Sequence, residues 1–311
     1  MGISRRMRIM KMKKILAAVL AAASMTAMLA GCSSSGDSAE TTAAETTAAA
    51  DGETAAEGET AEGDTEAASA EDKSLENVKA NGKFILGLDD SFPPMGFRDE
   101  NNEIVGFDID CAKEVASRMG VELVIQPIAW DSKQMELDSG NIDCIWNGMS
   151  INEERKEAMN LSDPYLKNDM VFVVLGSSDY QSQADLEGKN IAVQNGSSAQ
   201  EILEASDFAA KAGSIAGYDD NVTAFMDLDA NGVDAVFLDS VVANYFITEK
   251  QKDYRVLSDV LYEEEYAIGF RKGDQALRDE VQNTLNDMKA DGKLGEISTK
   301  WFGSDVTVIG E

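Results

Sequence analysis

Arg155 lies at a position where local electrostatics disfavour a cation. Residues 148–150 run into a helix that Asn152 is expected to cap, and Arg155 falls in the first turn of that helix. The helix macrodipole places partial positive charge there, so a guanidinium is locally unfavourable. Ion pairs with Glu153 and Glu154 are one explanation. The other is that Arg155 is held there to bind an anion.

Two further segments place polar groups where a predicted strand ends. Gln194 begins a turn of small residues that leads into a helix, and the free backbone N–H groups of such a turn suit an anion. An ordinary capped helix start explains the same residues. Asp239 ends an apolar strand, so its carboxylate either caps the next helix or faces a ligand cation. With Arg155, these groups match an α-amino acid zwitterion.

Strands and helices alternate around these segments. Strands are predicted at 83–88, 121–128, 143–146, 170–175, 190–193, 234–238 and 266–271. Helices are predicted from a cap at Asp108, over 131–139, from the Asn152 cap, over 221–230 and 239–246, and from residues 275 and 294. This alternation predicts α/β layers with largely parallel sheets, which bind ligands at the carboxyl ends of their strands.

The residue types exclude several kinds of chemistry. The chain has no histidine, which removes Ser-His-Asp and Cys-His catalysis and every histidine-ligated metal site. Cys111 and Cys144 are not spaced as a metal motif, so we interpret them as buried free thiols and leave a disulfide open as the alternative. We expect no catalytic residue, no metal and no cofactor.

The first 31 residues have the layout of a secretory signal. Six basic residues precede an apolar run over 15–30, which ends in Leu-Ala-Gly before Cys32. The run is short for a membrane-spanning helix, and an uncleaved anchor helix is the alternative. The motif is typical of lipoproteins, in which Cys32 would carry a diacylglyceryl group and become the first mature residue. Two acyl chains suffice for stable anchoring.

Residues 32–72 are predicted to form a disordered acidic tether that starts at the lipidated Cys32. Residues 33–72 contain twelve acids, no Lys or Arg, and no apolar residue larger than Ala, although an Ala-rich helix is the alternative. The signal holds six basic and no acidic residues, so 21 basic and 57 acidic residues remain without it, a net charge of −36. This charge argues against nucleic acid and anionic lipid heads as partners, so only a covalent membrane anchor is expected.

Five motifs recur through the remaining chain, at residues 87–97, 106–110, 148–155, 161–165 and 300–303. In order and spacing they resemble the family 3 solute-binding proteins for polar amino acids, over about residues 82–304. The resemblance implies an α/β fold of the two-lobed periplasmic-binding-protein type II, with two strand crossovers near 165–169 and 262–266 as a hinge. Lobe 1 would hold 73–166 and 267–311, and lobe 2 would hold 167–266.

The resemblance also implies a clamp for the zwitterion. Arg155 matches the arginine that forks onto the ligand α-carboxylate, a bidentate contact that lysine cannot make. The backbone amides of Ser150 and Ser198 would complete this carboxylate site. Asp239 matches the acid that holds the α-ammonium, with help from the Gly148 carbonyl.

Five other positions would meet the rest of the ligand. Phe92 and Trp130 match an aromatic pair that sandwiches the aliphatic stem. Asp89, Asn147 and Gln194 correspond to positions that face the ligand side chain.

The expected function is therefore extracytoplasmic binding of a polar or charged L-amino acid, of the cystine, basic or amide type, for an ABC importer. The partners would be the permease and ATPase subunits of that importer, and the protein would be a monomer attached to the membrane by its lipid anchor alone. A cyclic-acid dehydratase on the same fold, with Asp89 or Asp90 as general acid or base, is one alternative. An amino-acid sensor or adhesin is the other.

Overall fold

The computed structural model describes residues 71–310, except for the side chains of Val260 and Leu261. The predicted signal, Cys32 and the predicted tether before residue 71 lie outside these residues. The described helices are α1 (Ser74–Asn81), α2 (Phe107–Met119), α3 (Lys133–Asp138), α4 (Glu153–Ala158), α5 (Ser198–Ala205), α6 (Asn221–Asp229), α7 (Ser240–Thr248), α8 (Gln275–Ala290) and α9 (Lys293–Phe302), with 3-10 turns at Trp130–Ser132 and Gln183–Leu186. The strands are β1 (Lys83–Leu88), β2 (Ser91–Phe92), β3 (Gly96–Arg98), β4 (Ile104–Val105), β5 (Glu122–Pro127), β6 (Cys144–Ser150), β7 (Met159–Leu161), β8 (Leu166–Leu175), β9 (Asn190–Gln194), β10 (Ser214–Tyr218), β11 (Ala235–Asp239) and β12 (Tyr254–Arg271).

One sheet runs through the described chain in the order β10-β9-β11-β8-β12-β6-β1-β5, and β7 pairs with β12. The outer strands pair in parallel, β1 with β5 and β6, and β9 with β10 and β11. The central strands β8 and β12 pair antiparallel with each other, with β11 and with β6. The prediction of parallel pairing is confirmed for the outer strands and wrong for the centre, because β8 and β12 run past each other in opposite directions.

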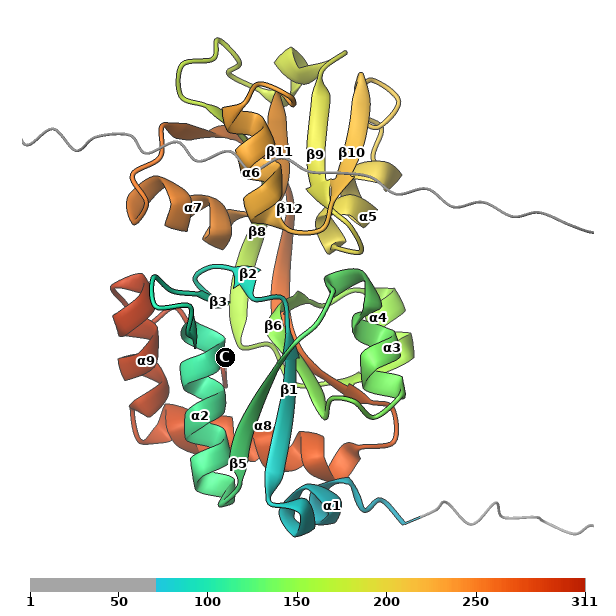
Figure 1. Ribbon diagram of the computed structural model, residues 1–311, viewed down its shortest axis with the longest axis vertical. Helices are drawn as coiled ribbons and strands as arrows, with labels where there is room; N and C mark the ends of the chain where they lie inside the picture. Colours follow the sequence, from blue (N-terminus) through green and yellow to red (C-terminus); the bar gives the residue numbers. More distant parts are fainter. Residues whose placement is uncertain (1–70, 311) are drawn as a thin grey trace, which may run out of the picture. The chain divides into compact units, whose positions relative to one another are not determined.

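Strands β8 and β12 connect two halves of the described chain (Figure 1). The first half contains β1, β5 and β6 with α1–α4, α8 and α9, and the second contains β9, β10 and β11 with α5, α6 and α7. At the crossing, Leu166 lies opposite Tyr266 and Asp169 lies opposite Glu263. The two crossovers implied by the resemblance are therefore present. The lobe boundaries at 166/167 and 266/267 lie at this crossing and stay a prediction.

The core explains why strands form where they do. All residues of β6 and β11 are buried, as expected for strands covered on both faces. On β6, Trp146 packs against Tyr165 with ring centroids 6.4 Å apart, and Tyr165 packs against Tyr266 at 6.3 Å. Cys111 and Cys144 are buried free thiols in the same core, so the free-thiol interpretation is confirmed and the disulfide alternative is wrong.

Helix α2 joins two of the sequence motifs. Its N-cap is Gly106 and not Asp108 as predicted, because Asp108 lies inside the first turn and is fully buried. The Asp108 Oδ2 atom accepts hydrogen bonds from the Gly148 N–H at 2.8 Å and from the Tyr165 hydroxyl at 3.0 Å. Burial raises the pKa of Asp108 to about 7. This carboxyl group therefore fixes the end of β6 rather than the start of α2.

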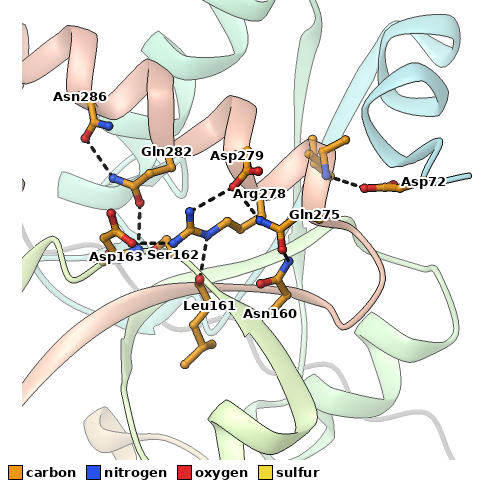
Figure 2. A network of polar contacts seen from close by, with 12 residues as sticks. Asp72, Asn160, Leu161, Ser162, Asp163, Gln275, Arg278, Asp279, Gln282 and Asn286 are labelled. Atoms are coloured by element: carbon orange, nitrogen blue, oxygen red, sulfur yellow. Dashed lines mark hydrogen bonds and ion pairs between the residues drawn. The ribbon is translucent and has the colours of Figure 1, made fainter. Parts of the chain in front are cut away.

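A polar network holds α8 against the segment that leads into β8 (Figure 2). Arg278 donates to the Leu161 carbonyl at 2.8 Å and pairs with Asp163 at 2.6 Å. Asp72 also contacts this helix, because its carboxylate accepts a hydrogen bond from the Ala276 N–H. Asp72 thus touches the folded part, although the sequence prediction places it in the tether.

Candidate functional site

One cavity collects nine of the ten residues that were predicted to bind a ligand. Its lining consists of Phe92, Trp130, Asn147, Gly148, Ser150, Arg155, Gln194, Ser197, Ser198 and Asp239. These residues come from the ends of β6, β9 and β11, from the starts of α4 and α5, and from β2 and the turn after β5. Asp89, the tenth predicted residue, reaches the lining through Gln194. The carboxyl ends of three strands therefore converge on one site, as the α/β pattern predicted.

Glycine is required at position 148 for this site to form. Gly148 has φ +57°, and a Cβ there would lie 2.9 Å from the Phe92 ring and 3.1 Å from the Tyr266 ring. Such a backbone conformation is strained for residues with a side chain. The Gly148 N–H is anchored on Asp108, which fixes the direction of the peptide. A larger residue would push the Phe92 ring away from the cavity.

Arg155 is buried with part of its hydrogen-bonding capacity unused. The Asn152 side chain caps α4 by accepting from the Arg155 N–H at 2.8 Å, as predicted. Arg155 is only 4% exposed; its Nη1 donates to the Ser150 carbonyl at 2.8 Å, while Nη2 has no hydrogen-bond partner. Burial lowers the pKa of Arg155, and Glu201, with an oxygen 3.8 Å from Nη2, opposes that shift. Within residues 71–310 the guanidinium pairs with Glu201 and not with Glu153 or Glu154.

Asp239 is a buried acid that does not act as a helix cap. It occupies the N-cap position of α7, yet its side chain makes no capping hydrogen bond there. Its Oδ1 accepts instead from the Asn168 side chain at 2.8 Å and from the Tyr266 hydroxyl. Burial, and then the neighbouring Glu264, raise the pKa of Asp239 well above its usual range. The cap interpretation is wrong, which leaves the carboxylate available to a ligand cation.

Two serine hydroxyls meet in the cavity from opposite halves of the structure. The Oγ atoms of Ser150 and Ser198 lie 2.8 Å apart. Ser197 caps α5 by accepting a hydrogen bond from the Gln200 N–H at 3.1 Å, so the alternative of an ordinary capped helix start is correct for Ser197. Ser198, the next residue, lines the cavity. The Ser150 hydroxyl also donates to Glu264 at 2.7 Å. Glu264 was not predicted.

A second set of polar side chains lies at the other end of the cavity. Gln194 donates its Nε2 to the Asp89 Oδ2 across the two halves at 2.7 Å, and the Asp89 N–H donates to the Asn147 side chain at 3.1 Å. Asn147 is 2% exposed, and its Nδ2 has no hydrogen-bond partner. Burial raises the pKa of Asp89 to about 6. This end therefore presents an unused amide donor and an acid that titrates near neutral pH.

A second cavity adjoins this end, and we call it the acidic vestibule. Its lining consists of Asp89, Asp90, Ser91, Ile128, Ala129, Trp130, Asp131, Asn195, Asp219 and Asp220. It shares Trp130 with the first cavity, and half of its lining residues are aspartates while none is basic. An electrostatic environment of this sign favours positive charge.

Lys133 closes one edge of the site. Its ammonium donates to the Gly196 carbonyl at 2.8 Å and to the Trp130 carbonyl at 3.2 Å, and it lies 5.0 Å from the centre of the Trp130 ring. A Cβ at Gly196 would lie 2.8 Å from the Asp131 Cα, so the two halves approach closely here. Burial lowers the pKa of Lys133 to about 8. The contact fixes the Trp130 ring against the turn that follows β9.

Sequence reasoning missed Glu264, Asn168 and Tyr266, which surround Asp239. They lie on β8 and β12, which were expected as crossovers and not as part of the site. One signal was available for Glu264. Successive strand residues alternate between faces, so Glu264 belongs on the same face as the aromatic Tyr266. In the structure both are buried, while Glu263 is exposed.

Known proteins share both the sequence and the fold. Residues 84–304 match the family of bacterial extracellular solute-binding proteins, family 3. The chain is 30% identical over 235 residues to the L-cystine-binding protein TcyJ of Escherichia coli (strain K12), covering 75% of this chain and 87% of that protein. It is 33% identical over 234 residues to the ABC transporter arginine-binding protein 1 of the same organism, covering 72% and 93%.

A solved structure agrees with the described fold. The crystal structure of an ABC uptake transporter substrate-binding protein from Streptococcus pneumoniae with bound histidine superimposes with a TM-score of 0.74 and 35% identity, covering 76% of this chain and 99% of that chain.

These relatives are amino-acid binders, which confirms the expectation of a binder and counts against the dehydratase alternative. Within residues 71–310, none of the helices has both the length and the apolar character to cross a membrane. The described fold is of the type II periplasmic-binding-protein class, and the protein is not an enzyme. The chain belongs to the bacterial extracellular solute-binding proteins of family 3.

Proposed function

We propose that this protein binds a polar or charged L-amino acid in the cavity between the two halves and delivers it to an ABC importer. One observation supports this most directly: Arg155, with an unpartnered guanidinium nitrogen, and Asp239, a carboxylate free of capping, line the same cavity. Arg155 and the serine hydroxyls suit an α-carboxylate, and Asp239 suits an α-ammonium. A zwitterion satisfies both groups at once.

The acidic vestibule supports one ligand type over the others. A ligand that extends past the Asp89–Gln194 hydrogen bond would enter a region lined by five aspartates and no basic residue. The charge of these aspartates favours a second positive group on the ligand, has little effect on an uncharged amide, and repels a carboxylate. We therefore propose a basic amino acid, which carries a positive group beyond its stem, and cystine as the second choice, because its distal ammonium is favoured there while its distal carboxylate is repelled. The relatives named for cystine, arginine and histidine accord with this choice.

The protein would work outside the cytoplasm, attached through a lipid on Cys32 and acting as a monomer with permease and ATPase subunits. Uptake separates this role from that of a sensor or adhesin. A strain that lacks the protein should lose uptake of the labelled ligand and regain it with the wild-type chain. Unchanged uptake would favour the sensor or adhesin.

The test of the ligand is a thermal-shift screen of the twenty amino acids, cystine and ornithine. A ligand present at 100 times its Kd stabilises the folded state by about 2.7 kcal/mol, which corresponds to roughly 5–10 °C for a domain of this size. We expect the largest shifts from basic L-amino acids or cystine, smaller shifts from amides, and none from aspartate or glutamate. The D-enantiomer of the best ligand is the matched control. Shifts from none of these compounds would overturn the proposal.

A further inference from the structure

Glu264 contacts Ser150 of the zwitterion site from outside the cavity lining, although it is one of three successive glutamates on a strand. It is 7% exposed, and on β12 it faces Asn168 of β8. Its Oε1 accepts from the Ser150 hydroxyl at 2.7 Å and from the Asn168 Nδ2 at 2.8 Å. The same Asn168 nitrogen donates to Asp239 at 2.8 Å. Glu264 therefore connects the ammonium end of the cavity to the carboxylate end.

The charges in the site do not balance if both acids are ionised. The ligand ammonium would neutralise Asp239, and the ligand carboxylate would neutralise Arg155. Glu264 would then remain as a buried carboxylate without a cation of its own. A buried, unpaired charge costs several kcal/mol, and such groups usually become neutral instead. Charge counting alone therefore favours a neutral Glu264 in the occupied site.

The hydroxyl protons lead to the same conclusion. Ser150 has one hydroxyl proton, and its oxygen lies 2.7 Å from Glu264 and 2.8 Å from Ser198. While that proton is donated to an ionised Glu264, Ser150 has none for the ligand carboxylate. A protonated Glu264 donates its own proton to the Ser150 oxygen, and the Ser150 proton then becomes available to the ligand.

We propose that Glu264 takes up one proton when the cavity closes on the ligand and acts in its neutral form as a positioning residue for Ser150. The proposal rests on the amino-acid site of the preceding subsection. The proton comes from solvent and no covalent bond changes. The ligand ammonium would hold Asp239 in its ionised form, against the burial that raises the pKa of Asp239 in the ligand-free cavity, so the two neighbouring acids have different roles.

Burial and the neighbouring groups shift the pKa of Glu264 in opposite directions. Burial raises the pKa of Glu264 most, while interactions with Ser150, Asn168 and Asp239 and the charge of Arg155 oppose the rise. The titratable and charged groups around it are Arg155 and Lys156 of α4, Lys167 and Asp169 of β8, Asp239 at the start of α7, and Glu263, Glu265, Tyr262 and Tyr266 of β12. The second acid, Asp239, is the charge nearest to the ammonium site.

Ligand affinity should fall as the pH rises. Burial in the closed cavity raises the pKa of Glu264 above the value that this carboxyl has in a cleft open to water. Between these two values the bound form holds one more proton, so affinity falls by up to about tenfold for each unit of rising pH. The chain has no histidine, and among residues 71–310 the other carboxyls with raised pKa values are Asp89, Asp108, Asp239 and Asp274.

Glu264→Gln isolates the contribution of Glu264, because glutamine keeps the accepting oxygen and mimics the neutral acid. The probes are L-arginine, L-histidine and L-cystine, each titrated calorimetrically between about pH 5 and 7.5 in buffers with different ionisation enthalpies. We expect wild type to take up about one proton and lose affinity as the pH rises. Glu264→Gln should take up none and keep the low-pH affinity within about threefold over the whole range. Glu263→Gln, on the exposed neighbour, should match wild type.

Several results would overturn the proposal. Proton uptake by wild type that persists in Glu264→Gln would assign the proton to another group. A loss of 30-fold or more at low pH in Glu264→Gln, equal to the loss in Asp239→Asn, would make Glu264 an ionised anchor. Infrared difference spectra of wild type provide a check that needs no variant, since ligand binding should create a protonated-carboxyl band. If wild type binds all probes without taking up a proton, this inference alone is refuted. If wild type binds no amino acid, the proposed function is refuted.

Discussion

Removal of the Arg155 guanidinium should weaken ligand binding strongly without lowering the stability of the ligand-free protein. In Arg155→Ala the ligand carboxylate loses its cation in a site where Arg155 is only 4% exposed. Removal of one partner from a desolvated charge pair costs about 2–5 kcal/mol, or roughly 30- to several-thousand-fold in Kd. The ligand-free protein loses one hydrogen bond to the Ser150 carbonyl but also a buried charge with an unpartnered Nη2. Its melting temperature should therefore stay within about 2 °C of wild type or rise.

Arg278 provides the matched control, because its contacts are confined to the network that holds α8 (Figure 2). Arg278→Ala should lower the free energy of unfolding by about 1–2 kcal/mol, which is roughly 3–8 °C, and leave Kd unchanged. Calorimetric titration with the best ligand of the thermal-shift screen and thermal melts without ligand measure both quantities. If Arg155→Ala melts several degrees lower and binds like wild type, Arg155 is structural and the reasoning about the cavity is refuted.

Four further predictions address other parts of the chain. Gly148→Ala should cost about 1–3 kcal/mol of stability and weaken binding, because the new Cβ would meet the Phe92 ring at 2.9 Å; unchanged melting and affinity would show that the ring can move aside. Cys32→Ala should release the protein into the medium or leave it unprocessed, and normal recovery in the membrane fraction would contradict the lipid anchor. Deletion of residues 33–70 from the soluble protein, which keeps the Asp72 contact, should change neither melting temperature nor affinity, and a loss of several degrees would reveal packing on the folded part. Asp108 has a folded-state pKa of about 7, above the unfolded value of about 3.9, so it binds more protons in the folded state and stability should fall as pH rises between these values. In thermal melts over about pH 4.5–8, Asp108→Asn should show a smaller fall in stability with pH than wild type. Equal falls in both proteins would assign the pH dependence to another group.

Features encoded by neighbouring residues could be predicted from the sequence. The cap of α4 depends on Asn152 and the three residues after it, and the predicted hydrogen bond is present at 2.8 Å. The resemblance to a known family predicted the cavity, since nine of its ten lining residues were named by their match to the family's ligand-binding positions. Helix α1 and strand β10 were not predicted. Both are short and largely exposed, so they lack a clear pattern of apolar residues.

Features assembled from distant residues could not be predicted. Asp108 has the residue type and position of a helix cap, but its buried contacts come from Gly148 and Tyr165, which lie 40 and 57 residues away. Glu264 sits in a run of three glutamates that has the appearance of a solvated surface. Its partner Ser150 is 114 residues away. Local propensity describes neither environment, because both exist only after the strands have paired.

Strand β12 has a consequence for how the chain reaches its destination. It is the last strand to leave the ribosome, yet it lies in the middle of the sheet between β8 and β6. Ser150 must pair with Tyr266 and Cys144 with Phe270, partners that are more than 100 residues apart along the chain. Contacts over such separations form slowly, because the entropy of closing a long loop opposes them. We therefore expect the first half to remain incompletely folded until nearly the whole polypeptide has been made. If the chain is exported as its predicted signal implies, late closure of the central sheet would keep the nascent chain in the unfolded form that a secretion channel can thread.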